Sequence, residues 1–223
     1  MYDRLIKLIG TEKFNELRKK KVLLIGLGGV GGYALEALVR SGLGTIIIID
    51  YDTIDITNLN RQIITNNSNI GLKKVDEAYI RAKSIDNDIN IIKHDTYLDK
   101  DNIDKYITSD IDYVIDACDS IHTKEAIIIK CLQNKIKFIS SMGTANKFKP
   151  ELLTITDLRK TSYDKLAKKL RIFVIKNHIT GKIPVVSSTE EVQKVSGLGS
   201  TSFVPATAGL MCASYVINDI INT

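Results

Sequence analysis

A glycine-rich turn between an apolar strand and a helix is the feature that most constrains the fold of this chain. The apolar run Val22–Ile25 leads directly into Gly26-x-Gly28-x-x-Gly31, a segment with helical periodicity follows, and the next apolar run ends on Asp50. Glycines allow a tight turn and a close approach of the backbone to phosphate. The start of a helix offers free N–H groups, and an acid at the end of the second strand can bind ribose hydroxyls. This unit therefore predicts a nucleotide-binding α/β domain.

The residues after Asp50 argue against a nicotinamide dinucleotide as the ligand. A dinucleotide has one pyrophosphate, which the glycine turn largely satisfies, whereas a triphosphate needs further cations and a metal-binding carboxylate. Arg61 and Lys74 are cations of this kind, and Asp116 and Asp119 follow a later apolar strand. Because the carboxyl ends of parallel strands line one crevice, we expect Asp50 and the two later aspartates to converge there. The pattern favours a nucleoside triphosphate.

The order of these motifs resembles that of a known group, the ATP-dependent adenylating enzymes related to MoeB, ThiF, HesA and the ubiquitin-activating enzymes. The matching stretches are GLGGVG at 26–31, IDYDTIDITNLNRQ at 49–62, GLKK at 71–74 and DACDS at 116–120. Further stretches are similar to the TcdA (CsdL) branch: RLIKLIG at 4–10, MGTANK at 142–147, KTS at 160–162, STE at 188–190 and GSTSFVP at 199–205. Members of that branch are tRNA threonylcarbamoyladenosine dehydratases. The resemblance covers essentially the whole chain.

The resemblance implies a site and a reaction. Arg61, Lys74 and Asp119 are the implied catalytic residues, Asp119 is the implied Mg²⁺ ligand, and Arg4 is expected to enter the site of a neighbouring subunit. The implied ATP-binding residues are Gly26, Gly28, Gly31, Asp50, Asp52, Asn58, Arg61, Gln62 and Lys74. The threonyl carboxylate of the modified tRNA would attack the α-phosphate of ATP, and the neighbouring carbamoyl oxygen would then close on the activated carbonyl. Because both groups belong to one substituent, this reaction needs no covalent cysteine.

The cysteines exclude several alternatives. Only Cys118, Cys131 and Cys212 occur, and they form no CxxC pair. We therefore expect no tetrathiolate zinc site, no disulfide framework and a reducing, cytoplasmic compartment. All three are interpreted as packing residues, including Cys118 inside the DACDS turn. We expect no signal peptide and no membrane association, because the apolar stretch 203–221 is interpreted as a buried C-terminal helix.

Alternating strands and helices predict a single domain over residues 1–223, with a Rossmann-like, doubly wound and mostly parallel sheet. The nucleotide-binding half covers about 1–145 and the substrate-binding half about 146–223, where antiparallel strands are added. We expect strands at 152–155 and 173–175, a basic helix near 162–171 between them, and a mobile substrate loop over 177–198. The other expected helices are 11–20, 30–41, 72–86, 101–107 and 120–134, and the other strands are 22–25, 45–50, 89–93, 112–116 and 138–141.

Charge is concentrated in the second half. Residues 147–182 contain ten Lys or Arg against three acids, a net +7 in a chain whose formal charge is +5. A basic face suits a phosphate backbone, although a basic helix is often only a solvated surface. Together with the resemblance, this segment predicts tRNA binding through Lys160, Lys168, Lys169 and Arg171. The resemblance to this family also implies a homodimer and allows a sulfurtransferase-type protein partner.

Two other functions stay open at this point. The first is an adenylating activator of a ubiquitin-like sulfur-carrier protein, of the MoeB or ThiF type, which would bind little tRNA. The second is a non-catalytic nucleotide-binding module, which would bind ATP without exchanging pyrophosphate. Retention of Arg61, Lys74 and Asp119 disfavours the second.

Overall fold

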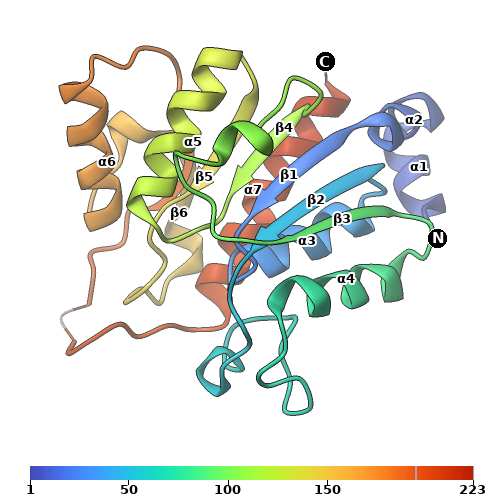
Figure 1. The fold of residues 1–223 in the computed structure, drawn as a ribbon, viewed down its shortest axis with the longest axis horizontal. Coiled ribbons are helices and arrows are strands. Elements are labelled where there is room, and N and C mark those ends of the chain that lie inside the picture. The colour runs from blue at the N-terminus through green and yellow to red at the C-terminus, as the bar shows by residue number, and fades with distance from the viewer. Residues whose placement is uncertain (194, 223) are drawn as a thin grey trace.

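One seven-stranded sheet runs through the molecule, and helices cover both of its faces (Figure 1). The structure is a computed structural model that describes residues 1–193 and 195–222. The strand order is β3-β2-β1-β4-β5-β7-β6, and only β6 runs antiparallel to its neighbour. The strands are β1 (Lys21–Ile25), β2 (Thr45–Asp50), β3 (Asn90–Asp95), β4 (Tyr113–Asp116), β5 (Lys137–Ser141), β6 (Leu153–Asp157) and β7 (Pro184–Ser188).

The helices lie in two layers. The α-helices are α1 (Asp3–Ile9), α2 (Thr11–Lys19), α3 (Gly31–Arg40), α4 (Lys74–Ile85), α5 (Ile121–Asn134), α6 (Lys165–Lys176) and α7 (Phe203–Ile221). Short 3-10 helices are η1 (Ile56–Asn58), η2 (Ile103–Lys105), η3 (Pro150–Leu152) and η4 (Leu158–Lys160). Side chains of α3, α4 and α7 fill one hydrophobic core, and side chains of α5 and α6 fill the other.

Burial on both faces explains why the central strands are continuously apolar. Along β1, Val22 and Leu24 enter the core beneath α3 and α7, whereas Leu23 and Ile25 enter the core beneath α5. The predicted doubly wound, mostly parallel sheet is confirmed. Its chain order reverses between β1 and β4, since β2 lies on one side of β1 and β4 on the other. In such sheets a ligand crevice forms outside the carboxyl ends of the strands at this reversal.

The expected strand over 173–175 is wrong, because these residues form the last turns of α6. The buried side chains of this helix are Ala167, Leu170 and Val174, which follow the three- and four-residue spacing of a helix face. Phe173 and Ile175 flank that face, so the short run of apolar residues was misleading. The basic helix expected near 162–171 is present, and it is longer than expected.

The expected loop over 177–198 is also partly wrong, because Pro184–Ser188 forms β7 in the interior of the sheet. It pairs in parallel with β5 and antiparallel with β6. The expected antiparallel strand at 152–155 is confirmed as β6, with β7 as its partner. The polar residues Ser187 and Ser188 favoured a loop in the sequence, yet both are buried in β7. Residue 194 of the expected loop lies outside the described residues.

The C-terminal helix α7 packs against α3 and the sheet, as expected from its hydrophobicity. It is 19 residues long with a mean hydropathy of 1.3, so length and composition alone would allow it to cross a membrane. Its residues Val204, Ala208, Cys212 and Val216 are fully buried in the core. The apolar face of α7 is therefore accounted for by the core of the domain.

Candidate active site

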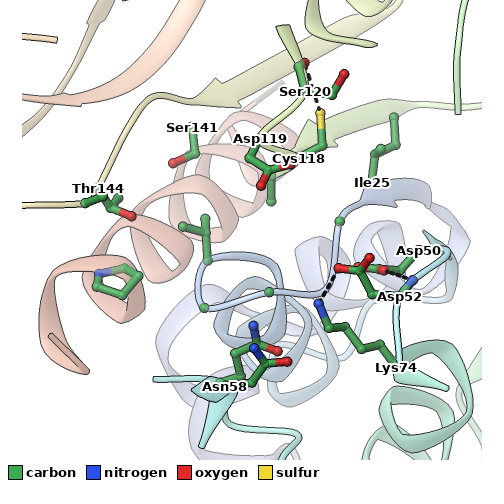
Figure 2. A pocket seen from close by; sticks show the side chains of 18 of the residues that line it. Ile25, Asp50, Asp52, Asn58, Lys74, Cys118, Asp119, Ser120, Ser141 and Thr144 are labelled. Carbon is green, nitrogen blue, oxygen red and sulfur yellow. Dashed lines mark hydrogen bonds and ion pairs between the residues drawn. The ribbon is translucent and has the colours of Figure 1, made fainter. Parts of the chain in front are cut away.

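A cleft of about 740 Å³ opens at the carboxyl ends of the central strands, at the reversal of the chain order (Figure 2). One wall consists of the glycine turn after β1 and the segment after β2. The other wall consists of the turns after β4 and β5, and residues 198–200 close one end. The site thus combines segments from both halves of the chain.

The glycine turn can form only without side chains at two positions. Gly26 has φ +88°, and a Cβ added there would lie 2.8 Å from the carbonyl oxygen of Ala117. A Cβ on Gly31, the first residue of α3, would lie 1.8 Å from the carbonyl oxygen of Gly26. Gly26 and Gly28 line the cleft, while Gly31 lies behind the turn and allows its close packing. The structure therefore contains the tight glycine turn, and its binding of phosphate stays a prediction.

Asp50 fixes the shape of this turn. Its carboxylate accepts hydrogen bonds from the backbone N–H of Leu27 at 2.6 Å and of Asp52 at 2.8 Å. Burial raises the pKa of Asp50, while the charge of Lys74 and the two backbone donors oppose this rise. Asp50 lines the cleft, where the sequence predicts a contact with ribose.

Lys74 forms an ion pair beside Asp50. Its Nζ lies 2.6 Å from Oδ2 of Asp52, and its side chain is only 6% exposed, against 44% for Asp52 (Figure 2). The lysine is the first residue of α4, and its N–H donates to the carbonyl of Asp52. Lys74 is thus held by the β2 side of the cleft, with Asp52 reaching toward solvent.

The third group of predicted residues lies on and after η1. Asn58 Oδ1 accepts from the N–H of Asp55, and Arg61 Nη1 donates to the Thr57 carbonyl at 2.9 Å and to Asn60 Oδ1 at 2.8 Å. Gln62 is 6% exposed, and its Oε1 has no hydrogen-bond partner among the described residues. Gln62 lines the cleft, and its side-chain amide can both donate and accept a hydrogen bond there.

Asp119 faces the same cleft from the turn after β4. It is exposed, and it lines the cleft together with Asp52 and Tyr51. The pKa of Tyr51 is raised first by the charge of Asp52, then by burial and by the charge of Asp119. Asp50 and Asp119 thus both line the cleft, as expected, but the expectation for Asp116 is wrong, because its carboxylate is fully buried behind the wall in an ion pair with Lys124. A cation would be stabilised between Asp52 and Asp119.

Cys118 is held by its neighbour at the end of β4. Its Sγ donates to Oδ1 of Asp116 at 3.0 Å, and burial together with the charge of Asp116 raises the pKa of this thiol well above its usual value. A thiol that stays protonated is a poor nucleophile. Cys131 and Cys212 are fully buried, as their interpretation as core residues predicts.

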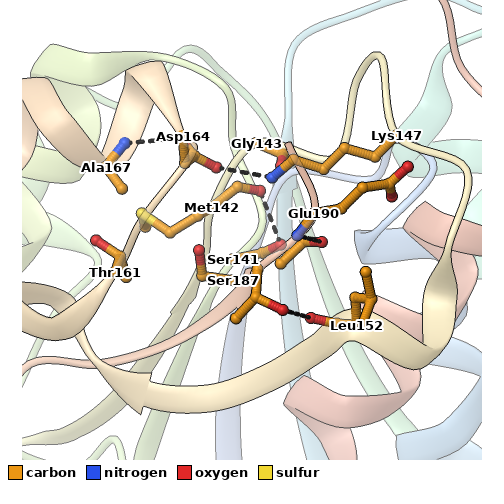
Figure 3. A network of polar contacts seen from close by, with 12 residues as sticks. Ser141, Met142, Gly143, Lys147, Leu152, Thr161, Asp164, Ala167, Ser187 and Glu190 are labelled. Carbon is orange, nitrogen blue, oxygen red and sulfur yellow. Dashed lines mark hydrogen bonds and ion pairs between the residues drawn. The ribbon is translucent and has the colours of Figure 1, made fainter. Parts of the chain in front are cut away.

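The wall opposite the glycine turn is supported by a second buried ion pair. Lys147 Nζ donates to the Gly143 carbonyl at 3.0 Å and lies 3.4 Å from Oδ2 of Asp164 (Figure 3). Both side chains are almost inaccessible, at 1% and 2% exposure. Asp164 Oδ1 also accepts from the N–H of Ala167 and so caps α6. The pair ties wall residues Gly143 and Thr144 to the start of the basic helix.

The predicted tRNA-binding residues lie around that helix, outside the cleft lining. Lys160, Lys168 and Lys169 are exposed. Arg171 differs, because its guanidinium donates to the carbonyl and the hydroxyl of Thr161 and is partly buried. Leu166 of the same helix does line the cleft, so α6 borders the site.

Arg4 lies on α1 and is not among the residues that line the cleft of its own chain. The other predicted residues, apart from Gly31, come together in the cleft: Gly26, Gly28, Asp50, Asp52, Asn58, Arg61, Gln62, Lys74 and Asp119. Three residues that support the walls from behind were not predicted from the sequence: Lys124, Lys147 and Asp164. Lys124 gave a signal, since it continues the apolar spacing of Ile127, Ile128 and Cys131 on α5.

The donor set at Asp119 fits one kind of metal. The described residues contain no group of three or more His, Cys, Asp or Glu side chains suited to hold a metal ion. Mg²⁺ commonly uses one or two carboxylates and completes its coordination with waters and substrate phosphates. The exposed carboxylate of Asp119, opposite the glycine turn, meets that requirement when a triphosphate is bound.

A glycine turn at the sheet reversal, with two cations and an exposed carboxylate around it, is typical of a nucleotide-binding α/β protein. The chain belongs to the ThiF family, and the match to this family covers residues 2–223.

Three comparisons illustrate the relationship. The chain is 35% identical to the tRNA threonylcarbamoyladenosine dehydratase of Bacillus subtilis over 232 residues, which covers 96% of this chain and 91% of the relative. The crystal structure of the Escherichia coli enzyme TcdA in complex with ATP has a TM-score of 0.94 at 33% identity, covering 99% of this chain and 93% of that one. A molybdopterin-synthase adenylyltransferase of Haemophilus influenzae is 28% identical, over 76% of this chain and 70% of the relative.

Proposed function

We propose that this protein is a tRNA threonylcarbamoyladenosine dehydratase, which uses ATP to cyclise the modified adenosine through adenylation of its carboxylate. The observation that carries this function is the full-length similarity to such enzymes together with an intact nucleotide cleft. The similarity extends through the second half of the chain, beyond the part that all nucleotide-binding domains of this type share. The raised pKa of the Cys118 thiol agrees with a reaction that needs no thioester intermediate.

In the proposed reaction, the threonyl carboxylate attacks the α-phosphorus of ATP and pyrophosphate leaves. The carbamoyl oxygen then attacks the acyl carbon, AMP leaves, and the carbamoyl nitrogen loses its proton. The modified nucleoside thus loses the elements of one water, which are taken up as ATP is cleaved to AMP and pyrophosphate. Both reacting groups sit on one nucleoside, so holding the threonyl side chain in a folded conformation supplies much of the rate enhancement.

The proposal assigns roles to the chain's own residues. Gly26, Gly28 and the start of α3 bind phosphate, and Asp50 binds the ribose while it fixes the turn. Arg61 and Lys74 offset the charge that develops on the phosphates as pyrophosphate leaves, and Asn58 and Gln62 orient the triphosphate. Asp119 would hold Mg²⁺, which supplies further charge neutralisation when bound.

The second half is proposed to bind tRNA. Lys160, Lys168 and Lys169 contact phosphates of the anticodon arm, and Arg171 contributes through its hold on Thr161 as well as its charge. Leu166 places this helix at the edge of the cleft, close to where the modified base must enter. This arrangement lets one helix serve both the tRNA backbone and the reactive nucleoside.

The proposal also includes a cytoplasmic homodimer in which Arg4 completes the partner's site. The position of α1 away from its own cleft supports a contribution in trans. A sulfurtransferase-type protein partner belongs to the proposal through family resemblance alone. The alternative, an activator of a sulfur-carrier protein, rests on the more distant molybdopterin-synthase adenylyltransferase.

The decisive test is nucleoside mass spectrometry after incubation of the protein with ATP, Mg²⁺ and threonylcarbamoylated tRNA. We expect the modified nucleoside to lose one water, with AMP and pyrophosphate released in equal amounts. A parallel reaction with a ubiquitin-like carrier protein in place of tRNA should release no pyrophosphate. An unchanged nucleoside beside formation of a carrier adenylate would replace this function with the alternative.

A further inference from the structure

Lys124 is completely buried behind the cleft, and all of its donors are used. Its Nζ donates to Asp116 Oδ2 at 2.9 Å, to the carbonyl of Ser141 at 2.9 Å and to Ser140 Oγ at 3.1 Å. An ammonium group has three N–H donors, so these contacts saturate it. Burial lowers the pKa of Lys124, but the charge and the hydrogen bond of Asp116, together with Cys118 and Cys212, raise it above its ordinary value, which keeps the amine protonated.

Asp116 is equally saturated, and its contacts lead to the turn that carries Asp119. Oδ2 accepts from Ser140 Oγ at 2.5 Å as well as from Lys124. Oδ1 accepts from the backbone N–H of Cys118 at 3.2 Å and from its Sγ. The pair therefore connects three elements: the turn after β4, helix α5 and the end of β5.

This ion pair is hard to explain by stability alone. Lys124 occupies a helix face that otherwise consists of Ile127, Ile128 and Cys131, where an apolar side chain would pack without losing hydration. Replacing a buried ion pair by apolar residues of similar size is often neutral or stabilising. The pair instead offers directed bonds, which set the relative position of two loops.

The two loops are the two parts of one cleft wall. The turn after β4 carries Asp119, and the segment after β5 carries Ser141, Gly143 and Thr144, all of which line the cleft. Figure 2 places Asp119 and Ser141 side by side on this wall, with Thr144 beyond them. Lys124 donates one hydrogen bond to the Ser141 carbonyl and another to Asp116, which directly precedes the turn that carries Asp119. The Lys124 side chain therefore links the two loops.

We propose that Lys124 is a positioning residue for adenylation: through Asp116 and the Ser141 carbonyl it fixes the spacing between Asp119 and the wall segment 141–144. This inference rests on the proposed function, in which Asp119 serves the phosphates. The wall segment 141–144 then borders the threonyl group whose carboxylate attacks. Neither Lys124 nor Asp116 lines the cleft, so both act through the backbone they hold.

The test replaces the whole pair, because Lys124→Met alone leaves Asp116 charged and buried, and that variant risks not folding. In Lys124→Met/Asp116→Asn, the asparagine keeps an acceptor for Cys118 while both charges disappear. The matched control is Lys20→Met/Asp112→Asn, which removes an ion pair of 3.1 Å between the end of α2 and the residue before β4, while the asparagine keeps an acceptor for the N–H of Lys21. These residues precede β1 and β4, so the control pair lies at the opposite ends of the strands from the cleft.

Two readouts are compared between the variants. The first is kinetic: kcat of the test pair, measured as tRNA-dependent pyrophosphate release, should fall about 100-fold while KM and Kd for ATP stay unchanged. The control should keep its kcat even if its melting temperature falls. The second is amide hydrogen exchange without substrate, which should become faster at 117–120 and 141–145 in the test pair alone.

Each outcome decides the proposal. A kcat equal to that of the control, or unchanged exchange at the two loops, would overturn the positioning role. A parallel loss of ATP affinity would also overturn it, because that pattern indicates general damage to the cleft. If the wild-type protein forms no cyclic nucleoside, the proposed function fails, and the exchange experiment still decides whether Lys124 couples the loops.

Discussion

At the scale of single residues, the exposed carboxylate of Asp119 shares the cleft with Asp52, and the charge of Asp52, burial and then the charge of Asp119 raise the pKa of Tyr51. We expect Asp119→Ala to lower kcat by about 10²–10³-fold, because it removes electrostatic stabilisation of the transition state. ATP affinity should change far less, since the glycine turn and Lys74 remain. Kinetics at saturating Mg²⁺ and ATP measure the first quantity, and calorimetric titration measures the second.

The control for this variant is Asp101→Ala, an exposed aspartate outside the cleft lining, which should leave both quantities unaltered. Near-normal turnover of Asp119→Ala at saturating Mg²⁺ would remove this carboxylate from the mechanism.

Cys118 lies in the cleft, yet its chemistry is suppressed. Because its pKa is raised, its thiolate fraction at pH 8 is smaller than that of an ordinary cysteine, and it grows only as the pH approaches the raised value. We therefore expect slow alkylation by iodoacetamide at pH 8 in the native protein, followed by intact mass, and rapid alkylation after unfolding. Cys118→Ala should keep its turnover. Trapping of an acyl thioester at Cys118 would contradict this expectation.

At the scale of secondary-structure elements, the Lys147–Asp164 pair joins the cleft wall to α6. Lys147→Met should destabilise the protein by about 3–5 kcal/mol, because it leaves a buried carboxylate without its partner. Adding Asp164→Asn should restore most of the lost stability, because it removes the unpaired buried charge. The asparagine can still cap α6 as aspartate does. Denaturant unfolding of both variants provides the comparison. Equal stability of the single and double variants would show that the charge of Asp164 is not the cause.

The basic face of α6 gives an electrostatic prediction. Lys168→Gln/Lys169→Gln should weaken tRNA binding and lower the slope of log K against log salt concentration by about one unit for each lost phosphate contact. Arg171 is left in place because it holds Thr161, so its replacement would also disturb the start of α6. Binding measured at several ionic strengths tests this, with ATP affinity expected to stay constant.

The matched control is Lys13→Gln/Lys19→Gln, which removes two exposed lysines from α2 and the same total charge. If both double variants show the same slope as the wild type, the lysines of α6 are only a solvated surface.

The elements that the sequence predicted well are those with one clear periodicity. The first five strands and helices α3, α4 and α5 follow from apolar runs and glycine punctuation, and the cleft residues follow from their places at strand ends. The helix expected over 101–107 is wrong, because only the 3-10 helix Ile103–Lys105 forms there. β7 was missed because two of its five residues are buried serines, whose place is decided by backbone pairing with β5 and β6. Lys124 and the Lys147–Asp164 pair were missed because a buried charge is set by a partner distant in sequence.

At the scale of the whole molecule, the proposed contribution of Arg4 to the partner's active site can be tested by subunit exchange. If Arg4 completes the site of a partner, Arg4→Ala and Asp119→Ala should each be inactive as homodimers. An equal mixture, after subunit exchange, should regain about a quarter of the wild-type activity, since half of the dimers are mixed and each carries one intact site. Pyrophosphate release before and after exchange measures the recovery, and native mass spectrometry confirms the mixed dimers.

A mixture that stays inactive although mixed dimers are present would contradict a contribution in trans. A monomeric wild-type protein with full activity would contradict the homodimer itself.

Helix α7 has a consequence for the order in which this protein can be made. Its side chains fill the same core as Leu24, Leu35 and Ile46 of the nucleotide-binding half. That core stays open on the ribosome until residues 203–221 have been translated, so the glycine turn and its acids cannot be consolidated as an early unit. We infer that a nascent chain becomes able to bind ATP only after residues 203–221 have emerged from the ribosome, and that its apolar strands depend until then on protection from aggregation.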